Sequence, residues 1–292
     1  MNKQQQGVSM SIHQADVLSR KCVASLGAWL VLTGMLLLPG HGIAQPVTLT
    51  DAGSSATIDL LSGAGMNNWS VLGQNQLMQQ WFWYRTDNGV AQPINTIGGL
   101  TYNLYNNNEV DAIYQNSQLS IEIDYLLSGG GVGSGNADMT ETITAKNLSG
   151  GPLNLNFYEY SYFDLLQSGN NNVTIFGSPG SGYYHVQQSS GSTAIQEAIT
   201  SPNANYAEAA NFNQTLNELN TQSGLMLNNN TTAGPGNVTW AFQWDQTIAA
   251  GDQLDIFKDK TLSIAEVPEP STVAIIALGA GALGLALRRK LS

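Results

Sequence analysis

The chain is 292 residues long, carries a formal net charge of −11 and contains a single cysteine. Between Gln45 and Glu266, four basic residues stand against nineteen acidic ones, a formal net charge of −15. Nucleic acid is an unsuitable partner for such a segment, because phosphate backbones are bound by clusters of Lys and Arg. A lone cysteine excludes a disulfide within the chain, so packing or bound ions must stabilise the fold.

The N-terminus has the parts of a secretory signal peptide. The basic pair Arg20-Lys21 precedes an apolar run over residues 22–38, and small residues, Gly42 and Ala44, follow it. Small side chains three and one residues before the cut are what signal peptidase requires. We therefore predict a helical signal peptide over residues 1–44, cut by signal peptidase after Ala44. The alternative is a first transmembrane helix that is retained; a lipoprotein signal does not fit, because the only cysteine does not follow the apolar run.

The middle of the chain, residues 45–266, has the alternating pattern of β-strands with one buried face. The clearest run, 238–245, places Val238, Trp240, Phe242 and Trp244 on one side. Similar alternation covers residues 119–125 and 153–157, and stretches rich in Gly, Asn and Pro separate the runs, at residues 129–135, 147–152, 169–172, 177–182 and 228–236. This spacing predicts an all-β protein, a single β-sandwich or jelly-roll-like ectodomain. One helix is expected, over residues 206–219.

The C-terminus has three parts in a fixed order. A short motif, Pro268-Glu269-Pro270, leads into uncharged apolar or small residues at 273–287, and a basic cluster, Arg288, Arg289 and Lys290, follows. Fifteen helical residues span roughly 22 Å, so this segment can cross a membrane with some thinning or snorkelling. Basic residues stay on the cytoplasmic side, which places the motif outside. We predict a transmembrane helix over 273–287, as part of a tail over 267–292.

This tail resembles the PEP-CTERM sorting signal, whose signature Pro268, Glu269 and Pro270 match residue by residue. The two prolines disfavour helix and hold the segment extended, the form that proteases bind. The resemblance implies recognition by exosortase, a polytopic membrane protease and transpeptidase-like enzyme of Gram-negative bacteria that make exopolysaccharide. It also implies an inner-membrane protein with a periplasmic ectodomain, which processing near Pro270 releases or transfers to the cell surface or extracellular matrix.

The ectodomain shows no catalytic motif. His185 is the only histidine left after signal removal, and its surroundings lack the G-x-S-x-G context of a serine nucleophile. Without cysteine, the usual His/Cys zinc sites are excluded. The glycine-rich stretch 129–135 fits no phosphate-binding pattern and has no lysine nearby. We therefore predict a chain that is not an enzyme and that has no catalytic residue, cofactor or metal site.

Acidic residues leave one catalytic alternative open. Glu122 and Asp124 lie on one strand face, and Glu159 lies in a tyrosine-rich segment that ends at Asp164, so either set could serve glycoside hydrolysis. The ordinary explanation is that such carboxylates lie on the wet face of a strand. Calcium binding by loop carboxylates such as Asp87 or Asp252 is similarly open, although no EF-hand spacing occurs.

Two tryptophans offer a binding alternative. In Trp81-Phe82-Trp83-Tyr84 each strand face receives two aromatic side chains, so one pair must find a second apolar surface or be exposed. Exposed Trp81 or Trp83 would stack on sugar rings, whereas a sandwich would cover both faces.

The function predicted from the sequence is that of an exported, non-enzymatic protein of the cell envelope or extracellular matrix, sorted through its tail. Its expected partners are signal peptidase, an exosortase-like enzyme, the membrane and an exopolysaccharide. The alternative is a secreted protein that binds or cleaves polysaccharide.

Overall fold

The computed structural model describes residues 46–131 and 133–264. Within these ranges, eighteen strands of different lengths form two sheets of nine strands each. Only short helical segments lie beside them. The prediction of an all-β sandwich is confirmed. The predicted signal peptide, Pro-Glu-Pro motif, transmembrane helix and basic cluster lie outside the described residues. In the part that is described, no helix is long and apolar enough to cross a membrane.

The first sheet has the strand order β1-β2-β3-β5-β11-β17-β15, with β4 paired to β3 and β6 paired to β5. Neighbouring strands are antiparallel except β3 and β5, which touch over a short parallel stretch. Its strands are β1 (Val47–Asp51), β2 (Ser54–Asp59), β3 (Gly65–Val71), β4 (Gln74–Asn75), β5 (Leu77–Arg85), β6 (Gln92–Pro93), β11 (Leu153–Phe163), β15 (Tyr206–Asn211) and β17 (Val238–Ile248).

The second sheet has the order β16-β12-β13-β14-β18-β10-β9-β8-β7 and is antiparallel throughout. Its strands are β7 (Thr101–Tyr105), β8 (Glu109–Gln115), β9 (Leu119–Gly129), β10 (Asn136–Asn147), β12 (Asn171–Ser178), β13 (Gly182–Ser190), β14 (Thr193–Ser201), β16 (Thr232–Gly236) and β18 (Gln253–Ser263). The helical segments are η1 (Ile94–Ile97), η2 (Leu165–Gln167) and α1 (Gln214–Thr221).

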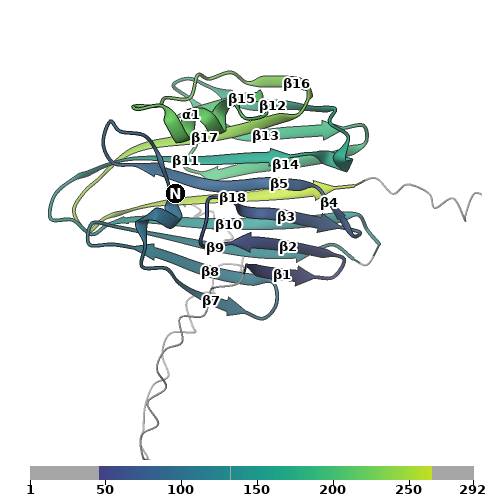
Figure 1. Ribbon diagram of the computed structural model, residues 1–292, viewed down its shortest axis with the longest axis horizontal. Helices are drawn as coiled ribbons and strands as arrows, with labels where there is room; N and C mark the ends of the chain where they lie inside the picture. The colour runs from purple at the N-terminus through teal and green to yellow at the C-terminus, as the bar shows by residue number, and fades with distance from the viewer. Residues whose placement is uncertain (1–45, 132, 265–292) are drawn as a thin grey trace, which may run out of the picture. The chain divides into compact units, whose positions relative to one another are not determined.

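Segments far apart in sequence form the middle of both sheets (Figure 1). In the second sheet, β18 from the end of the domain inserts between β10 and β14. In the first sheet, β11 lies between β5 and β17. Strands that pair across such distances close long loops, so the core forms only when the whole domain folds.

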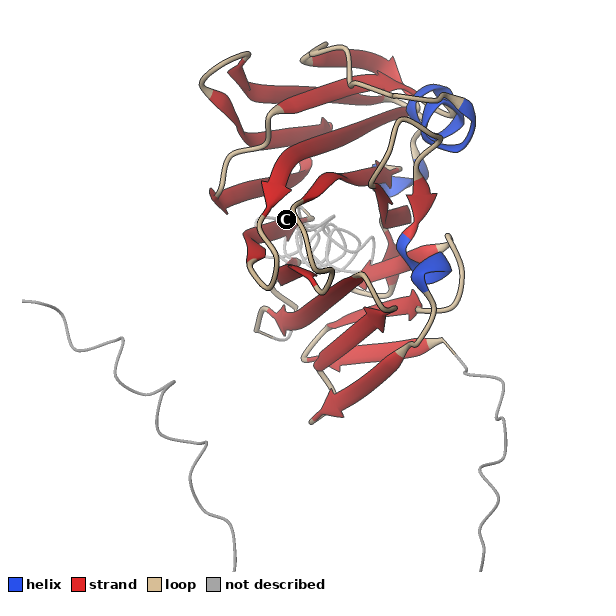
Figure 2. Ribbon diagram, turned by 90° about the vertical axis from the view of Figure 1, so that its left-hand side faces the viewer, coloured by secondary structure: helices blue, strands red, loops and turns tan. Residues whose placement is uncertain are grey.

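The core lies between the two facing sheets (Figure 2) and is rich in aromatic rings. Phe82 and Phe157 stack at 5.5 Å between ring centroids, and Phe163 stacks on Trp240 at 5.2 Å. Such pairs add to the stabilisation that comes from burying their area.

The first sheet is covered on its outer face as well. Helix α1 packs on β15 and β17, and the irregular segment 222–231 lies beside it. In Figure 2 the longest helical segment, drawn in blue, is α1 and lies on this side of the molecule. For this reason β17 is buried on both faces from Val238 to Trp244, although its sequence alternates.

The predicted strands at 119–125, 153–157 and 238–245 are confirmed as parts of β9, β11 and β17. The predicted helix over 206–219 is wrong in its first half. Residues 206–211 form β15, which pairs along its full length with β17, and only residues 214–221 are helical. Pairing with a central strand outweighed the near-helical spacing of the apolar residues.

Candidate functional site

Five charged side chains meet inside the sandwich, and we call them the buried charge cluster. Lys258 and Lys260 come from β18, Glu141 from β10, Glu197 from β14 and Glu159 from β11. All five side chains are fully buried. Strand alternation explains this placement, because residues two apart on a strand share a face, and these residues occupy the inward positions.

The contacts within the buried charge cluster are close. Lys258 Nζ lies 2.5 Å from Glu141 Oε2 and 2.5 Å from Glu159 Oε1. Lys260 Nζ donates a hydrogen bond to Glu141 Oε1 at 3.0 Å, and it lies 2.8 Å from Glu159 Oε1 and 3.1 Å from Glu197 Oε2. Each lysine is therefore in contact with carboxylates from both sheets, and the cluster joins the sheets electrostatically.

Three carboxylates and two ammonium groups leave one negative charge in excess, and the carboxyl groups differ in the direction of their pKa shifts. Burial alone would raise the pKa of Glu159, but Lys258 and Lys260 lower it to about 2. Burial and then the Glu159 carboxylate raise the pKa of Glu197 to about 7. Burial would lower the pKa of Lys260, but the three carboxylates hold it well above its usual value. Of the two carboxyl groups with shifted pKa values, Glu197 is thus the one that favours its protonated form.

The walls of the cluster are apolar and amide groups. Lys258 Nζ lies 5.0 Å from the centroid of the Phe82 ring, within reach of a cation–π interaction. Gln80 Nε2 lies 3.4 Å from both Glu141 Oε2 and Glu159 Oε1. Chemically, this arrangement can hold and relay a proton and can bring an amine against a carboxyl group away from water. No group of three or more His, Cys, Asp or Glu residues in the described ranges is arranged to hold a metal ion.

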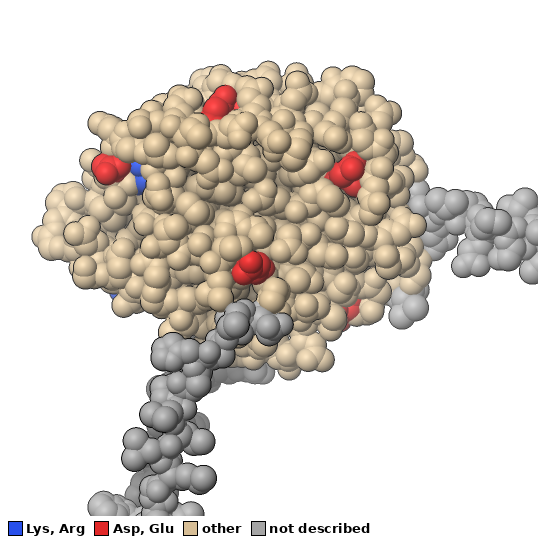
Figure 3. Space-filling view, viewed as in Figure 1, with Lys and Arg blue, Asp and Glu red and all other residues tan. Residues whose placement is uncertain are grey.

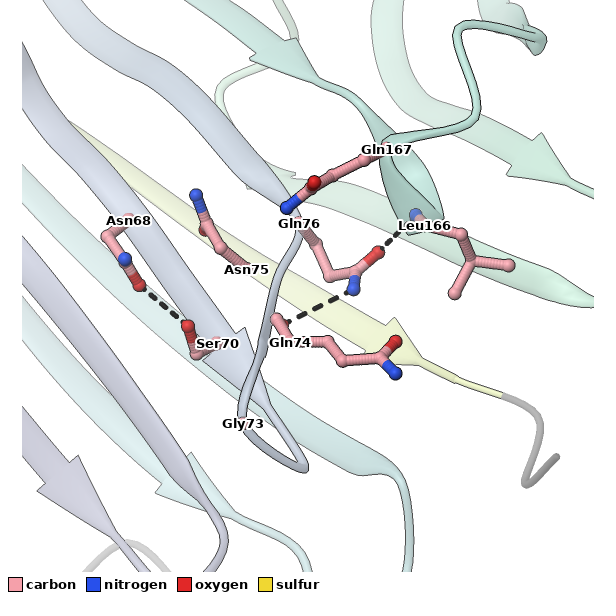
Figure 4. Close-up of a pocket in the computed structure, with 8 residues that line it drawn as sticks. All are labelled: Asn68, Ser70, Gly73, Gln74, Asn75, Gln76, Leu166 and Gln167. Carbon is pink, nitrogen blue, oxygen red and sulfur yellow. Dashed lines mark hydrogen bonds between the residues drawn. The ribbon is translucent and has the colours of Figure 1, made fainter. Parts of the chain in front are cut away.

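A second candidate is an open hollow of about 530 Å³ at the end of β3 and the β4 hairpin (Figure 4). Its lining is uncharged and mostly amide: Asn68, Ser70, Gly73, Gln74, Asn75, Gln76, Leu166 and Gln167. Gln76 Oε1 accepts a hydrogen bond from the Leu166 backbone N–H at 2.7 Å, which ties η2 to the residue that follows β4. The Gln74 and Gln167 side chains are exposed, and neither has a partner among the described residues. Their amides can both donate and accept hydrogen bonds to a ligand's hydroxyl groups.

The structure buries both tryptophans that the sequence offered for stacking on sugars. Trp81 is 0% exposed, and its ring packs edge-on against Tyr114 of β8. Trp83 is 2% exposed; its N–H donates to Asn220 Oδ1 from α1, and its ring packs on Tyr160. Neither ring presents a face to solvent, because α1 and η1 cover this part of the first sheet. Both faces of β5 are therefore covered at these positions, as expected for the alternative of a sandwich that covers both faces.

The candidate carboxylates separate into different regions. Glu122 and Asp124 lie on the outer face of the second sheet, opposite the inward Ile121 and Ile123. Glu159 turns into the core instead, so it cannot act together with Glu122 on one substrate. Asp164 follows the end of β11, and its Oδ1 accepts a hydrogen bond from the Gly169 N–H at 3.0 Å.

The other residues considered as candidates in the sequence lie in turns, in a strand or in a connection between strands. Asp87 closes a turn by accepting the Gly89 N–H at 2.7 Å, and Asp252 is exposed in the turn between β17 and β18. His185 is half-buried on β13, with its ring 5.2 Å from that of Phe176. The stretch 129–135 connects β9 to β10.

Cations are scarce on the surface. Of the Lys and Arg residues that the structure describes, Arg85, Lys258 and Lys260 are buried, and Lys146 alone is exposed. The face seen in Figure 3 is mostly uncharged, with a few acidic side chains scattered over it. Four acidic residues, Glu141, Glu159, Glu197 and Glu208, are buried as well. The charged groups that remain outside the core are therefore almost all acidic.

Sequence reasoning missed the buried charge cluster. One signal was available: in Ile256-Phe257-Lys258-Asp259-Lys260, the inward-facing set contains Ile256 and the only two lysines of that region. Lysines that share a strand face with a core isoleucine indicate buried, paired charges, since an unpaired buried ammonium group is too costly.

Comparisons with known proteins found matches for two parts of the chain, the C-terminal tail and the β-sandwich domain. Residues 266–290 match the PEP-CTERM protein-sorting motif. Comparison with curated protein sequences gave no match. The chain therefore carries the sorting signal of an exported protein that an exosortase processes at the membrane.

Among solved structures, the domain is similar to a bacterial glucoamylase complexed with acarbose, with a TM-score of 0.53, 10% identity, and coverage of 82% of this chain and 36% of the glucoamylase. It is also similar to a putative aldose 1-epimerase from Escherichia coli K12 (TM-score 0.52, 8% identity, 76% of this chain and 99% of that one). A galactose mutarotase related enzyme from Lactobacillus acidophilus is comparable (TM-score 0.52, 7% identity, 77% and 100%). At such identities the likeness shows the fold alone. This chain's match spans about a third of the glucoamylase's length.

Proposed function

We propose that this chain is a non-enzymatic structural protein of the cell surface or extracellular matrix, delivered as a rigid β-sandwich by exosortase-dependent sorting. The observation that carries the proposal is the PEP-CTERM motif at residues 266–290. The chain is made with a signal peptide, is held in the inner membrane by residues 273–287 with its ectodomain in the periplasm, and is then cut near Pro270.

The ectodomain supports a structural role through its construction. It buries polar and charged groups between the sheets, and its surface contains almost no cations. An acidic, largely amide-covered surface remains soluble among polysaccharide chains and is drawn together by the divalent cations of a matrix. In the described residues, the one cluster with strongly perturbed pKa values of both signs is sealed inside the core, where no substrate reaches it.

The test compares the intact mass and the cell fraction of the native chain with those of a variant in which Pro268, Glu269 and Pro270 are all replaced by Ala. We expect the native protein to start at Gln45, to end near the motif and to leave the membrane fraction. The variant should keep its C-terminal residues and remain in the membrane. A matched control, Leu291→Ala with Ser292→Ala, alters the tail beyond the basic cluster and should be processed normally. Retention of residues 273–292 by the native protein contradicts the proposal.

A second function, polysaccharide binding, is favoured by the hollow in Figure 4. Amide side chains around an uncharged depression suit hydroxyl-rich ligands, because each amide offers both donors and an acceptor. Gln74→Ala together with Gln167→Ala should weaken retention of the protein on its host's exopolysaccharide at least tenfold. Gln118→Ala, an exposed glutamine elsewhere, is the control. Equal retention of all three proteins contradicts binding at the hollow.

A further inference from the structure

Glu141 and Lys258 are direct cross-strand partners in the β10–β18 ladder, and both side chains turn inward. Cβ atoms of such partners lie about 5 Å apart. The long lysine side chain therefore brings its nitrogen to the glutamate carboxyl group rather than past it.

Lys258 Nζ makes two contacts of equal length, to Glu141 Oε2 and to Glu159 Oε1, and of these two residues Glu141 is its direct cross-strand partner. Lys258 Nζ lies 2.5 Å from Glu141 Oε2, yet it makes no hydrogen bond to any described residue. Lys260, by contrast, donates a well-formed hydrogen bond to the other oxygen of Glu141, Oε1, at 3.0 Å. The Lys258 nitrogen is thus held against the Glu141 carboxyl group without the geometry of a donated N–H.

We propose that Lys258 and Glu141 become joined by an isopeptide bond inside the folded domain. The Lys258 Nζ nitrogen forms a bond to the Glu141 side-chain carbonyl carbon, Cδ, and the bond from Cδ to Oε2 breaks. The product is a secondary amide between β10 and β18.

Atoms and charges balance with no further reagent. The ammonium group of Lys258 has three hydrogens, of which the amide keeps one. The other two leave with the carboxylate oxygen as one water molecule. The positive charge of Lys258 and the negative charge of Glu141 disappear together, so the net charge of the cluster does not change.

Neighbouring groups are placed to assist each step. The Glu159 carboxylate lies 2.5 Å from Lys258 Nζ, where it can accept the proton that frees the nitrogen lone pair. The charge of Lys258, which is the largest of the effects that lower the Glu159 pKa, disappears in the same transfer. The hydrogen bond from Lys260 stabilises the negative charge that develops on Glu141 Oε1 during the attack. Glu197 Oε1 lies 3.6 Å from Lys258 Nζ, and this carboxyl group holds the proton that the departing oxygen needs.

Burial drives the reaction towards the amide. In water, the separate ions are favoured because both are well hydrated. Here both side chains are fully buried, and keeping two ions away from water is costly even when they are paired. A neutral amide removes that cost, and the released water molecule leaves the apolar core. Afterwards Lys260, Glu159 and Glu197 remain, one cation with two carboxyl groups that share a proton.

Peptide mapping of the exported full chain tests the proposal. The native protein is denatured and digested with a protease that cleaves after Asp and Glu. A branched peptide should appear, in which residues 139–159 are joined to residues 256–259, with the mass of both lowered by one water molecule. The linear peptide 256–259 should be nearly lost. Fragmentation places the junction between Lys258 and Glu141.

Three variants sharpen the experiment. Lys258→Met removes the nucleophile and should abolish the branched peptide, whereas Lys146→Met changes an exposed lysine and should keep it in full. Glu159→Gln removes the proton acceptor and should reduce the linked fraction at least tenfold. Recovery of linear 256–259 from the native protein at full yield overturns the proposal, and a junction at Glu159 or Glu197 overturns the assignment to Glu141.

Discussion

Lys260 Nζ reaches Glu141 on its own sheet at 3.0 Å and Glu159 on the opposite sheet at 2.8 Å. One buried ammonium group thereby ties the two halves of the sandwich together. The domain has charged groups in its core, where a β-sandwich normally has aliphatic side chains. The stability of this core therefore depends on every buried ammonium group and carboxylate having a partner of opposite charge.

Removal of one partner from the buried charge cluster should therefore be costly. Lys260→Met keeps the apolar stem but leaves carboxylates without a counter-charge, and we expect a loss of about 3–5 kcal/mol in the free energy of unfolding. Urea unfolding followed by tryptophan fluorescence measures it. Lys146→Met, at an exposed site, should change stability by less than about 0.5 kcal/mol.

A double variant tests whether charge balance is the cause. Adding Glu159→Gln to Lys260→Met removes the ionised carboxylate that Lys260 contacts, so the double variant should recover at least half of the lost stability. Simple additivity of the two single losses would contradict electrostatic coupling inside the cluster.

The sequence could predict the strands but not which face of each is inside. In β18, the exposed set contains Phe257 and Asp259, and the inward set contains Lys258 and Lys260. Both faces therefore mix charged residues with apolar ones, and period two alone does not choose between them. The choice comes from the neighbours: β10 and β14 supply Glu141 and Glu197 at positions next to the lysines. Pairing between strands so far apart in the sequence is not visible in a local pattern.

Gly65 fits where no other residue can. It has φ of +56°, and a Cβ there would meet Trp81 Cε3 at 2.3 Å and the Gln80 carbonyl oxygen at 2.5 Å. Gly65→Ala should cost about 3 kcal/mol, because left-handed strain adds to overpacking against backbone. The control is Gly53→Ala, since Gly53 has no heavy atom within 4 Å of the added carbon. Similar thermal midpoints for the two variants would show that β3 can shift away from Trp81.

Glu208 on β15 is a buried carboxylate whose partners come from the covering elements. Its Oε1 accepts the Thr215 hydroxyl of α1 at 2.7 Å, and burial raises its pKa. Thr215→Val keeps the shape but leaves the carboxylate short of a donor, which should cost about 1–3 kcal/mol. Thr221→Val, at the exposed end of the same helix, should cost less than half as much. Equal losses in chemical denaturation would assign the effect to helix propensity rather than to Glu208.

The elements that cover the first sheet also explain why the sequence did not predict the burial of two aromatic rings. Trp83 and Tyr160 belong to the face that α1 and the segment 222–231 cover. A short irregular segment has no periodic signature, so the sequence left open whether these rings are exposed. The fold class, by contrast, follows from alternation and turn composition, which are local.

While Lys258 and Glu141 are still separate ions, stability should be greatest in mildly acidic solution, because the pKa shifts of the cluster have both signs. The pKa of Glu197 is raised to about 7 by burial and by Glu159, above its usual 4.5. The folded state therefore holds this proton over an interval in which the unfolded state has lost it, and stability falls as pH rises from about 4.5 through 7. The pKa of Glu159 is lowered to about 2, the net result of burial and the stronger effect of Lys258 and Lys260, so stability also falls as pH drops from about 4.5 towards 2.

The groups facing Glu197 are Glu159, Lys258 and Lys260, so a variant at Glu197 isolates the upper limb of this profile. Glu197→Gln is neutral at every pH, and its free energy of unfolding should be nearly flat between pH 5 and about 7 if no other group contributes. Asp111 and Asp124, whose pKa values burial and neighbouring acidic groups raise to about 6, add a slope of the same sign that both proteins share, so the slope of Glu197→Gln should be shallower than that of the native protein. Urea titrations at several pH values compare the two proteins, and an unchanged slope in Glu197→Gln would mean that the excess proton of the cluster resides on another carboxyl group.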